Sequence, residues 1–209
     1  MEITIDVSEL SVNTRVSIVK EISNEDTLIE FAKDDNYSVG KAILNNKKIN
    51  KEILDALADN ENVNIRVLVA EHVKTSKETL EKLARDEKMW VRRVVAINKH
   101  TPSSVLAELA NDSNAIVRAA VARNTNTLVK TQLILARDES PYVRTALIHN
   151  ENYSFRVLST LIKDTDVGVR EAAEKIYNYF YGWPKRASSV MDGGSFFVKY
   201  NVLFIKNIK

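Results

Sequence analysis

The sequence predicts an all-α solenoid of about six and a half repeats of 26 residues, followed by a short non-repeat C-terminal segment. Three observations predict it. An arginine returns every 26 residues, an acidic or amide side chain stands six residues before each arginine, and apolar residues recur between them at helical spacing. The recurring pairs are Asn60/Arg66, Asp86/Arg92, Asp112/Arg118, Asp138/Arg144 and Asp164/Arg170. Such a period is typical of arrays in which each unit packs only on its neighbours.

Two short helices are expected in each repeat, because apolar residues at i, i+3 and i+4 form one stripe on each of them. The clearest unit has these stripes at Leu80, Leu83 and Ala84 and then at Val91, Val95 and Ala96. Thr101 followed by Pro102 is typical of an N-cap with proline at the first helical position, and Thr75 and Thr127 share that register.

Asparagine recurs at the end of the second helix of the repeat. The column is Asn46, Asn98, Asn124 and Asn150, with His72 in the remaining position. Because asparagine tolerates left-handed backbone and bonds to nearby backbone groups, we expect a column of turn-forming residues. The histidines His72, His100 and His149 lie in different repeats without ligand spacing, so no metal site is expected.

The recurring aspartates and arginines are interpreted as a structural ladder, because a feature present in every repeat serves stacking. We expect each carboxylate to accept amide protons at the start of the second helix, and each arginine to bind the carboxylate of its own or an adjacent repeat. The ladder residues are Asp86, Arg92, Asp112, Arg118, Asp138, Arg144, Asp164 and Arg170. Upstream, Asp34 is followed by Gly40 at the arginine position, which predicts a break in the ladder and a less rigid unit.

These aspartate and arginine pairs, six residues apart between two short helices, resemble the HEAT family. The segment from Thr101 to Asn124 looks like the bacterial leucine-rich repeat variant, a compact HEAT-like unit. The resemblance covers about residues 8 to 176 and implies a right-handed α–α superhelix. The founding type of that variant also carries an iron–sulfur cluster on cysteines, and this chain has no cysteine, so no cofactor is expected. The expected domains are the solenoid at 1–180 and a tail at 181–209.

Charge and composition narrow the classes of function. The net charge is +2, but the segment 181–209 carries five positive charges against one negative charge, which leaves residues 1–180 at −2. Nucleic-acid binders usually show a basic folded body, so this balance disfavours them. The absence of cysteine, of a signal-peptide pattern and of a long apolar run predicts a cytoplasmic protein that does not span a membrane.

Candidate binding residues occupy outward-facing positions that vary between repeats. Trp90, Ile116 and Tyr142 begin the second helix in three consecutive repeats; they either fill the joint between units or form an exposed anchor patch with Arg93 and Arg123 as its polar rim. The candidate partner-binding residues are Trp90, Arg93, Ile116, Arg123, Tyr142 and His149.

No nucleophile–base pair, phosphate loop or carboxylate dyad emerges, so we expect a non-catalytic scaffold that binds a protein partner. Two alternatives stay open. Some alkylpurine DNA glycosylases resemble this architecture, which would make the chain an enzyme that cradles DNA. The aromatic and β-branched run at 195–205 predicts a strand, through which a structural or regulatory subunit would oligomerise.

Overall fold

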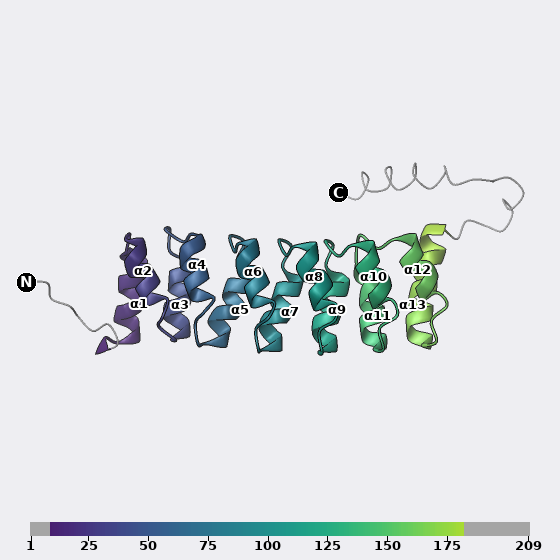
Figure 1. Ribbon diagram of the computed structural model, residues 1–209, viewed down its shortest axis with the longest axis horizontal. Coiled ribbons are helices and arrows are strands. Elements are labelled where there is room, and N and C mark those ends of the chain that lie inside the picture. Colours follow the sequence, from purple (N-terminus) through teal and green to yellow (C-terminus); the bar gives the residue numbers. More distant parts are fainter. Residues whose placement is uncertain (1–8, 182–209) are drawn as a thin grey trace, which may run out of the picture.

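The computed structural model describes residues 9–181, and within this range the chain forms thirteen α-helices and no strand. The helices stand side by side in chain order along an elongated molecule (Figure 1). The prediction of an all-α solenoid is therefore confirmed. The predicted strand at 195–205 and all of the predicted tail except Tyr181 lie outside the described residues.

The helices alternate between two positions in the repeat. The first helices are α2 (Glu25–Phe31), α4 (Lys51–Leu57), α6 (Lys77–Leu83), α8 (Ser103–Leu109), α10 (Val129–Leu135) and α12 (Phe155–Leu161). The second helices are α3 (Tyr37–Leu44), α5 (Val63–Glu71), α7 (Met89–Ile97), α9 (Ala115–Arg123), α11 (Pro141–Ala146) and α13 (Val167–Tyr181). A 3₁₀ turn, η2 (Leu147–His149), extends α11. The leading helix α1 (Val12–Glu21) packs on α3 as a second helix does. No first helix precedes it among the described residues, which therefore make up six and a half units.

Stacking is carried mainly by the second helices. Each of them, from α1 to α13, packs on the second helix of the next repeat, and the buried side chains form one continuous core along the array. The predicted stripes are part of it: Leu80, Leu83, Val91 and Val95 are all buried. Burial of each such side chain contributes about 1.5–3 kcal/mol, so every joint between repeats is held by several apolar contacts.

The recurring threonines have a different role from the predicted one. Thr101 is not an N-cap. The helix α8 begins at Ser103, one residue later than predicted, and Pro102 is its N-cap. Its buried hydroxyl instead donates to the carbonyl of Val95, at 2.6 Å. Thr75 and Thr127 make the same bond to the residue six positions earlier. The threonine thus gives a second hydrogen bond to a carbonyl at the end of the preceding second helix, which also accepts from the backbone amide three residues later.

The asparagine column joins consecutive repeats. The Asn150 side-chain amide donates to the carbonyls of Ala122 and Asn124 in the preceding repeat, at 2.8 and 2.9 Å, while its oxygen accepts from the amide of Asn152. Asn46, Asn98 and Asn124 also bond to carbonyls of the preceding unit. Of the two predicted reasons, bonding to nearby backbone groups is confirmed, since the oxygens of Asn98, Asn124 and Asn150 accept from the amides two residues later. The other is wrong: the backbone at these residues is extended, with negative φ, so left-handed geometry plays no part.

His72 occupies the asparagine position between α5 and α6 and cannot reproduce both bonds to the preceding repeat. Its Nδ1 accepts from the amide of Lys74, and burial, with the nearby Lys74 charge, lowers its pKa below the ordinary value of 6.5. Because the unfolded chain takes up this proton more readily than the folded one, the contribution of His72 to stability is present above about pH 6.5 and is lost as the pH falls below it.

We expect His72→Asn to stabilise the protein by about 1 kcal/mol at pH 7, since asparagine can donate to the preceding repeat as Asn98 does. The advantage should widen between pH 7 and pH 5, because the variant has no imidazole to protonate. Urea unfolding at several pH values checks this, with His100→Asn at an exposed turn as the control. A difference that stays constant with pH would contradict the proposed role of the His72 proton.

The aspartate–arginine ladder connects adjacent repeats. Arg118 donates from Nε and Nη2 to both carboxylate oxygens of Asp138, 20 residues later, at 2.7 and 2.9 Å. Its Nη1 donates to the backbone carbonyl of Asp112 in its own repeat, at 2.8 Å. Arg66, Arg92 and Arg144 repeat this pattern with Asp86, Asp112 and Asp164. Of the two expected partners, the structure selects the carboxylate of the next repeat, while the arginine's own repeat supplies a carbonyl.

The carboxylates also hold the start of each second helix, as predicted, because Asp138 accepts the amide proton of Ser140. Burial would raise the pKa of Asp138, but the hydrogen bonds from Arg118 and Ser140 and the charges of Arg118 and Arg144 outweigh burial and hold the pKa below its ordinary value. Arg170 is the last ladder arginine among the described residues. It donates to the carbonyl of Asp164, and the position 20 residues later lies outside the described residues.

At the predicted break in the ladder, three residues differ together from the other repeats: Gly40, Asn60 and Ile65. The carboxylate position 20 residues after Gly40 holds the neutral Asn60, whose amide donates to the carbonyls of Ala32 and Asp34, at 2.7 and 2.9 Å. The Asp34 carbonyl is the one that an arginine at position 40 would reach. The residue that packs on Gly40 is Ile65, whereas the four following repeats have valine there. Gly40, Asn60 and Ile65 therefore form one neutral alternative to a charged rung.

We expect Gly40→Ala to destabilise the wild-type protein by about 1–3 kcal/mol, because a Cβ at this position would lie 2.5 Å from the buried Ile65 Cδ1. In an Ile65→Val background the loss should be smaller, since valine lacks the Cδ1 atom and alanine is favoured over glycine inside a helix by about 0.5–1 kcal/mol. A γ-carbon, which lies 2.8 Å from the added Cβ in the wild type, still has to shift. Urea unfolding of the four proteins measures the coupling. An equal effect of Gly40→Ala in both backgrounds would contradict it.

Candidate functional site

The middle of the array presents a surface that the ladder and the core do not explain. The helices α7, α9 and α11, with η2, contain no aspartate or glutamate, although each contains arginine or histidine. Trp90, Ile116 and Tyr142 are 57%, 38% and 48% exposed. The interpretation that these three residues fill the joint between units is therefore wrong, and they lie on the surface as the anchor-patch hypothesis requires.

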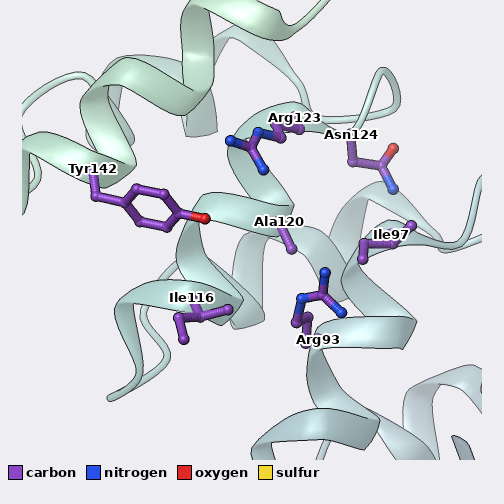
Figure 2. A pocket seen from close by; sticks show the side chains of 7 residues that line it. All are labelled: Arg93, Ile97, Ile116, Ala120, Arg123, Asn124 and Tyr142. Carbon is purple, nitrogen blue, oxygen red and sulfur yellow. The ribbon is translucent and has the colours of Figure 1, made fainter. Parts of the chain in front are cut away.

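A shallow hollow of about 250 Å³ lies on this surface. Its lining comes from three consecutive second helices and consists of Arg93, Ile97, Ile116, Ala120, Arg123, Asn124 and Tyr142. Figure 2 shows the guanidinium groups of Arg93 and Arg123 and the hydroxyl of Tyr142 pointing toward Ala120 from different sides. We call this feature the arginine hollow.

The floor of the arginine hollow depends on a small residue. Ala120 stands where the two preceding repeats have Leu68 and Val94. A branched side chain at this position would occupy the space on which the three polar ends converge. The next repeat also has alanine, Ala146, at this position, so the hollow depends on the side chains around Ala120 as well as on its small size.

The two arginines that line the hollow differ from the ladder arginines. Arg123 lies over the ring of Tyr142, with its Cζ 5.8 Å from the ring centroid, in a cation–π contact. Across residues 9–181, neither Arg93 nor Arg123 has an ion pair with a carboxylate. Arg93 is also half-buried, so part of its side chain packs on the protein while its guanidinium has no anionic partner among the described residues. This combination favours binding of an anion.

Asn124 lines the hollow but is fully engaged elsewhere. Its amide donates to the carbonyls of Ala96 and Asn98, and its oxygen accepts from the amide of Asn126. Asn124 therefore contributes shape to the hollow and no free polar group.

The structure brings together four of the six predicted binding residues, namely Arg93, Ile116, Arg123 and Tyr142. Trp90 and His149 do not line the hollow, although both are exposed and stand at its ends in the repeat register. Ile97 and Ala120 were missed. An exposed isoleucine at the end of a second helix was a usable signal for Ile97, whereas the role of Ala120 depends on what surrounds it.

A second hollow, of about 350 Å³, lies between α4 and α6 and is lined by Asp55, Ala56, Asp59, Glu78, Thr79 and Lys82. Its charged groups already have partners: Lys82 pairs with Asp59 at 2.6 Å, and Thr79 donates to Asp55. It offers no unpaired group comparable with Arg93, so it is a joint between repeats.

Within residues 9–181, no group of three histidine or acidic side chains is arranged to hold a metal ion. None of the described helices has the length and apolar character needed to cross a membrane.

Comparison with known proteins gives a weak likeness to a solved structure. No family model and no curated protein matches the chain. Among solved structures, the chain is similar to one described as a leucine-rich repeat variant with a novel repetitive protein structural motif. The identity is 23% and the TM-score 0.38, over 80% of this chain and 77% of that chain. A likeness at this level says nothing about what the chain binds.

Proposed function

We propose that this chain is a non-catalytic scaffold that binds a protein partner through the surface of α7, α9 and α11. The observation that carries the proposal is the exposure of Trp90, Ile116 and Tyr142 on three consecutive second helices, beside two arginines that have no ion pair with a carboxylate. Exposed aromatics and arginine are the side chains that most often anchor protein interfaces. We also infer membership of the HEAT-like, leucine-rich repeat variant class, which the aspartate–arginine ladder supports.

The ladder argues for a scaffold over an enzyme. Each of the aspartates Asp86, Asp112, Asp138 and Asp164 is bound by an arginine of the preceding repeat. A DNA glycosylase built on such an array would need an exposed acidic residue on a continuous basic surface. The surface of α7, α9 and α11 has no acidic residue. The same columns continue with Glu71 on one side and with both Glu171 and Lys175 on the other, so they form no continuous basic row.

The test is affinity capture from a lysate with the full chain as bait, with and without nuclease, read by mass spectrometry. Wild type should retain a protein partner in both samples, and Trp90→Ala/Tyr142→Ala should lose it while unfolding at the same temperature. Tyr37→Ala is the matched control, because Tyr37 is an exposed tyrosine with Lys41 5.9 Å from its ring centroid, in a different repeat.

Two outcomes would overturn the proposal. If the double variant retains the same proteins as wild type, the surface of α7, α9 and α11 is not the interface. If proteins are recovered only without nuclease, the chain binds nucleic acid and the protein-scaffold interpretation fails.

A further inference from the structure

We infer that the arginine hollow binds a carboxylate side chain of an acidic peptide segment, with a neighbouring apolar side chain of the same segment against Ile97 and Ile116. This inference rests on the proposed function and names the chemistry of the partner. Its first support is the state of Arg93 and Arg123, which converge with the Tyr142 hydroxyl on one small volume above Ala120 (Figure 2).

Other arginines of the array bind a carboxylate where one lies within reach of the guanidinium group. Arg118 binds both oxygens of Asp138, and Arg85 binds both oxygens of Glu108 in the next repeat at 3.0 Å. The planar guanidinium matches a carboxylate with two parallel hydrogen bonds, which makes the pair directional as well as strong. Arg93 and Arg123 have the same capacity, and no carboxylate of α7, α9 or α11 can fill it.

The hollow is partly organised before a ligand arrives. The contact of Arg123 with the Tyr142 ring restricts the guanidinium, so less side-chain entropy is lost on binding. The Tyr142 hydroxyl adds a further donor on the same side. Ile97, 49% exposed, and Ile116 supply an apolar wall next to these donors. A carboxylate followed by an apolar side chain matches this arrangement better than a free anion does.

Charge complementarity favours a protein carboxylate over a chain of phosphates. Affinity for nucleic acid grows with the number of phosphates that are neutralised, so a strand-binding groove needs a long row of cations. In the columns that contain Arg93 and Arg123, the repeats on either side mix signs, with Glu71 before the hollow and both Glu171 and Lys175 after it. The positive positions therefore do not form a continuous row, which suits a few acidic side chains.

The experiment selects binders of the full chain from a display library of random 12-residue peptides. We expect the selected peptides to be enriched in aspartate or glutamate beside an apolar residue. Arg93→Gln/Arg123→Gln should abolish this enrichment, and Arg137→Gln, the matched control at an exposed arginine after α10, should preserve it. For a selected peptide measured by fluorescence anisotropy, the double variant should raise Kd at least about tenfold, as expected for losing charge-assisted bonds.

Selected peptides without acidic enrichment, or equal enrichment with the double variant, would overturn the inference. Displacement of the bound peptide by an equal concentration of single-stranded oligothymidylate would also overturn it, since the hollow would then prefer phosphates. The carboxylate site can fail while the proposed function holds: captured partners that depend on Trp90 and Tyr142, but not on Arg93 and Arg123, leave the scaffold intact and refute only the carboxylate site.

Discussion

Replacing Arg118 with alanine is expected to destabilise the array by about 3–5 kcal/mol, which is the usual cost of removing one partner of a buried ion pair. Arg118 is almost fully buried and makes bonds to Asp138 in the next repeat and to the Asp112 carbonyl in its own. The variant removes both Arg118 donors from the buried Asp138 carboxylate, which keeps only the Ser140 amide, and it removes the donor of the Asp112 carbonyl. Urea unfolding followed by circular dichroism measures the loss.

The chain itself suggests how to rescue this variant. At the Gly40/Asn60 rung, the missing arginine is accompanied by a neutral amide that bonds to the carbonyl the arginine would have reached. We therefore expect Arg118→Ala/Asp138→Asn to recover at least about 1 kcal/mol relative to Arg118→Ala, because no unpaired charge stays buried. A double variant no more stable than the single one would show that the cost lies in lost packing.

Arg123→Ala is the matched control, since Arg123 lies on the same helix but is exposed and bound only to an aromatic ring. Its unfolding should change by less than about 1 kcal/mol. Because each repeat packs only on its neighbours, hydrogen exchange should show the effect of Arg118→Ala concentrated in α9 to α12. Uniform weakening of all repeats would contradict a ladder made of local links.

The second large effect is expected at Asn150, whose side chain is fully buried, joins two repeats through two hydrogen bonds and accepts a third from the amide of Asn152. We expect Asn150→Ala to cost about 2–4 kcal/mol, because the carbonyls of Ala122 and Asn124 lose a donor inside the protein. Asn111→Ala is the control: Asn111 is exposed and bonds only within its own turn, so its loss should cost less than about 1 kcal/mol.

Asn150→Asp makes the prediction specific to hydrogen-bond direction. Aspartate has nearly the same shape and keeps the oxygen that accepts from Asn152, but it aims a carboxylate at two carbonyl oxygens. At pH 7 it should therefore destabilise more than alanine does, and acidification should recover part of the loss, because a protonated carboxyl can donate. If aspartate is tolerated as well as asparagine, the column acts through turn geometry alone.

The difference between prediction and structure is clearest at the ladder. The 26-residue spacing of Arg66 to Arg170 was visible in the sequence, and so was the structural role of the paired residues. The sequence separation of six suggested Asp112 as readily as Asp138 for Arg118. Only the stacking of repeats decided it, since the distance between helices of neighbouring units brings the guanidinium to the carboxylate 20 residues later.

The candidate site shows the same limit. Trp90, Ile116 and Tyr142 were recognisable as a column, but whether the column faced the joint or the solvent depends on the rotation of α7, α9 and α11 about their axes. That rotation is set by the packing of residues such as Val91 and Val95 against the next repeat. A column on a short helix lies close to the boundary between buried and exposed positions, so periodicity alone could not assign it.

By itself the sequence determined the repeat length, the two helices of each unit, the apolar stripes and the membership of the aspartate, arginine and asparagine columns. These follow from local rules, because helical spacing and turn chemistry act over a few residues. Tertiary structure alone decided the partner of each column member, the exposure of Trp90 and Tyr142, the neutral rung at Gly40 and the hollow above Ala120. Each of these is a contact between residues of different repeats, and its geometry depends on how the repeats stack.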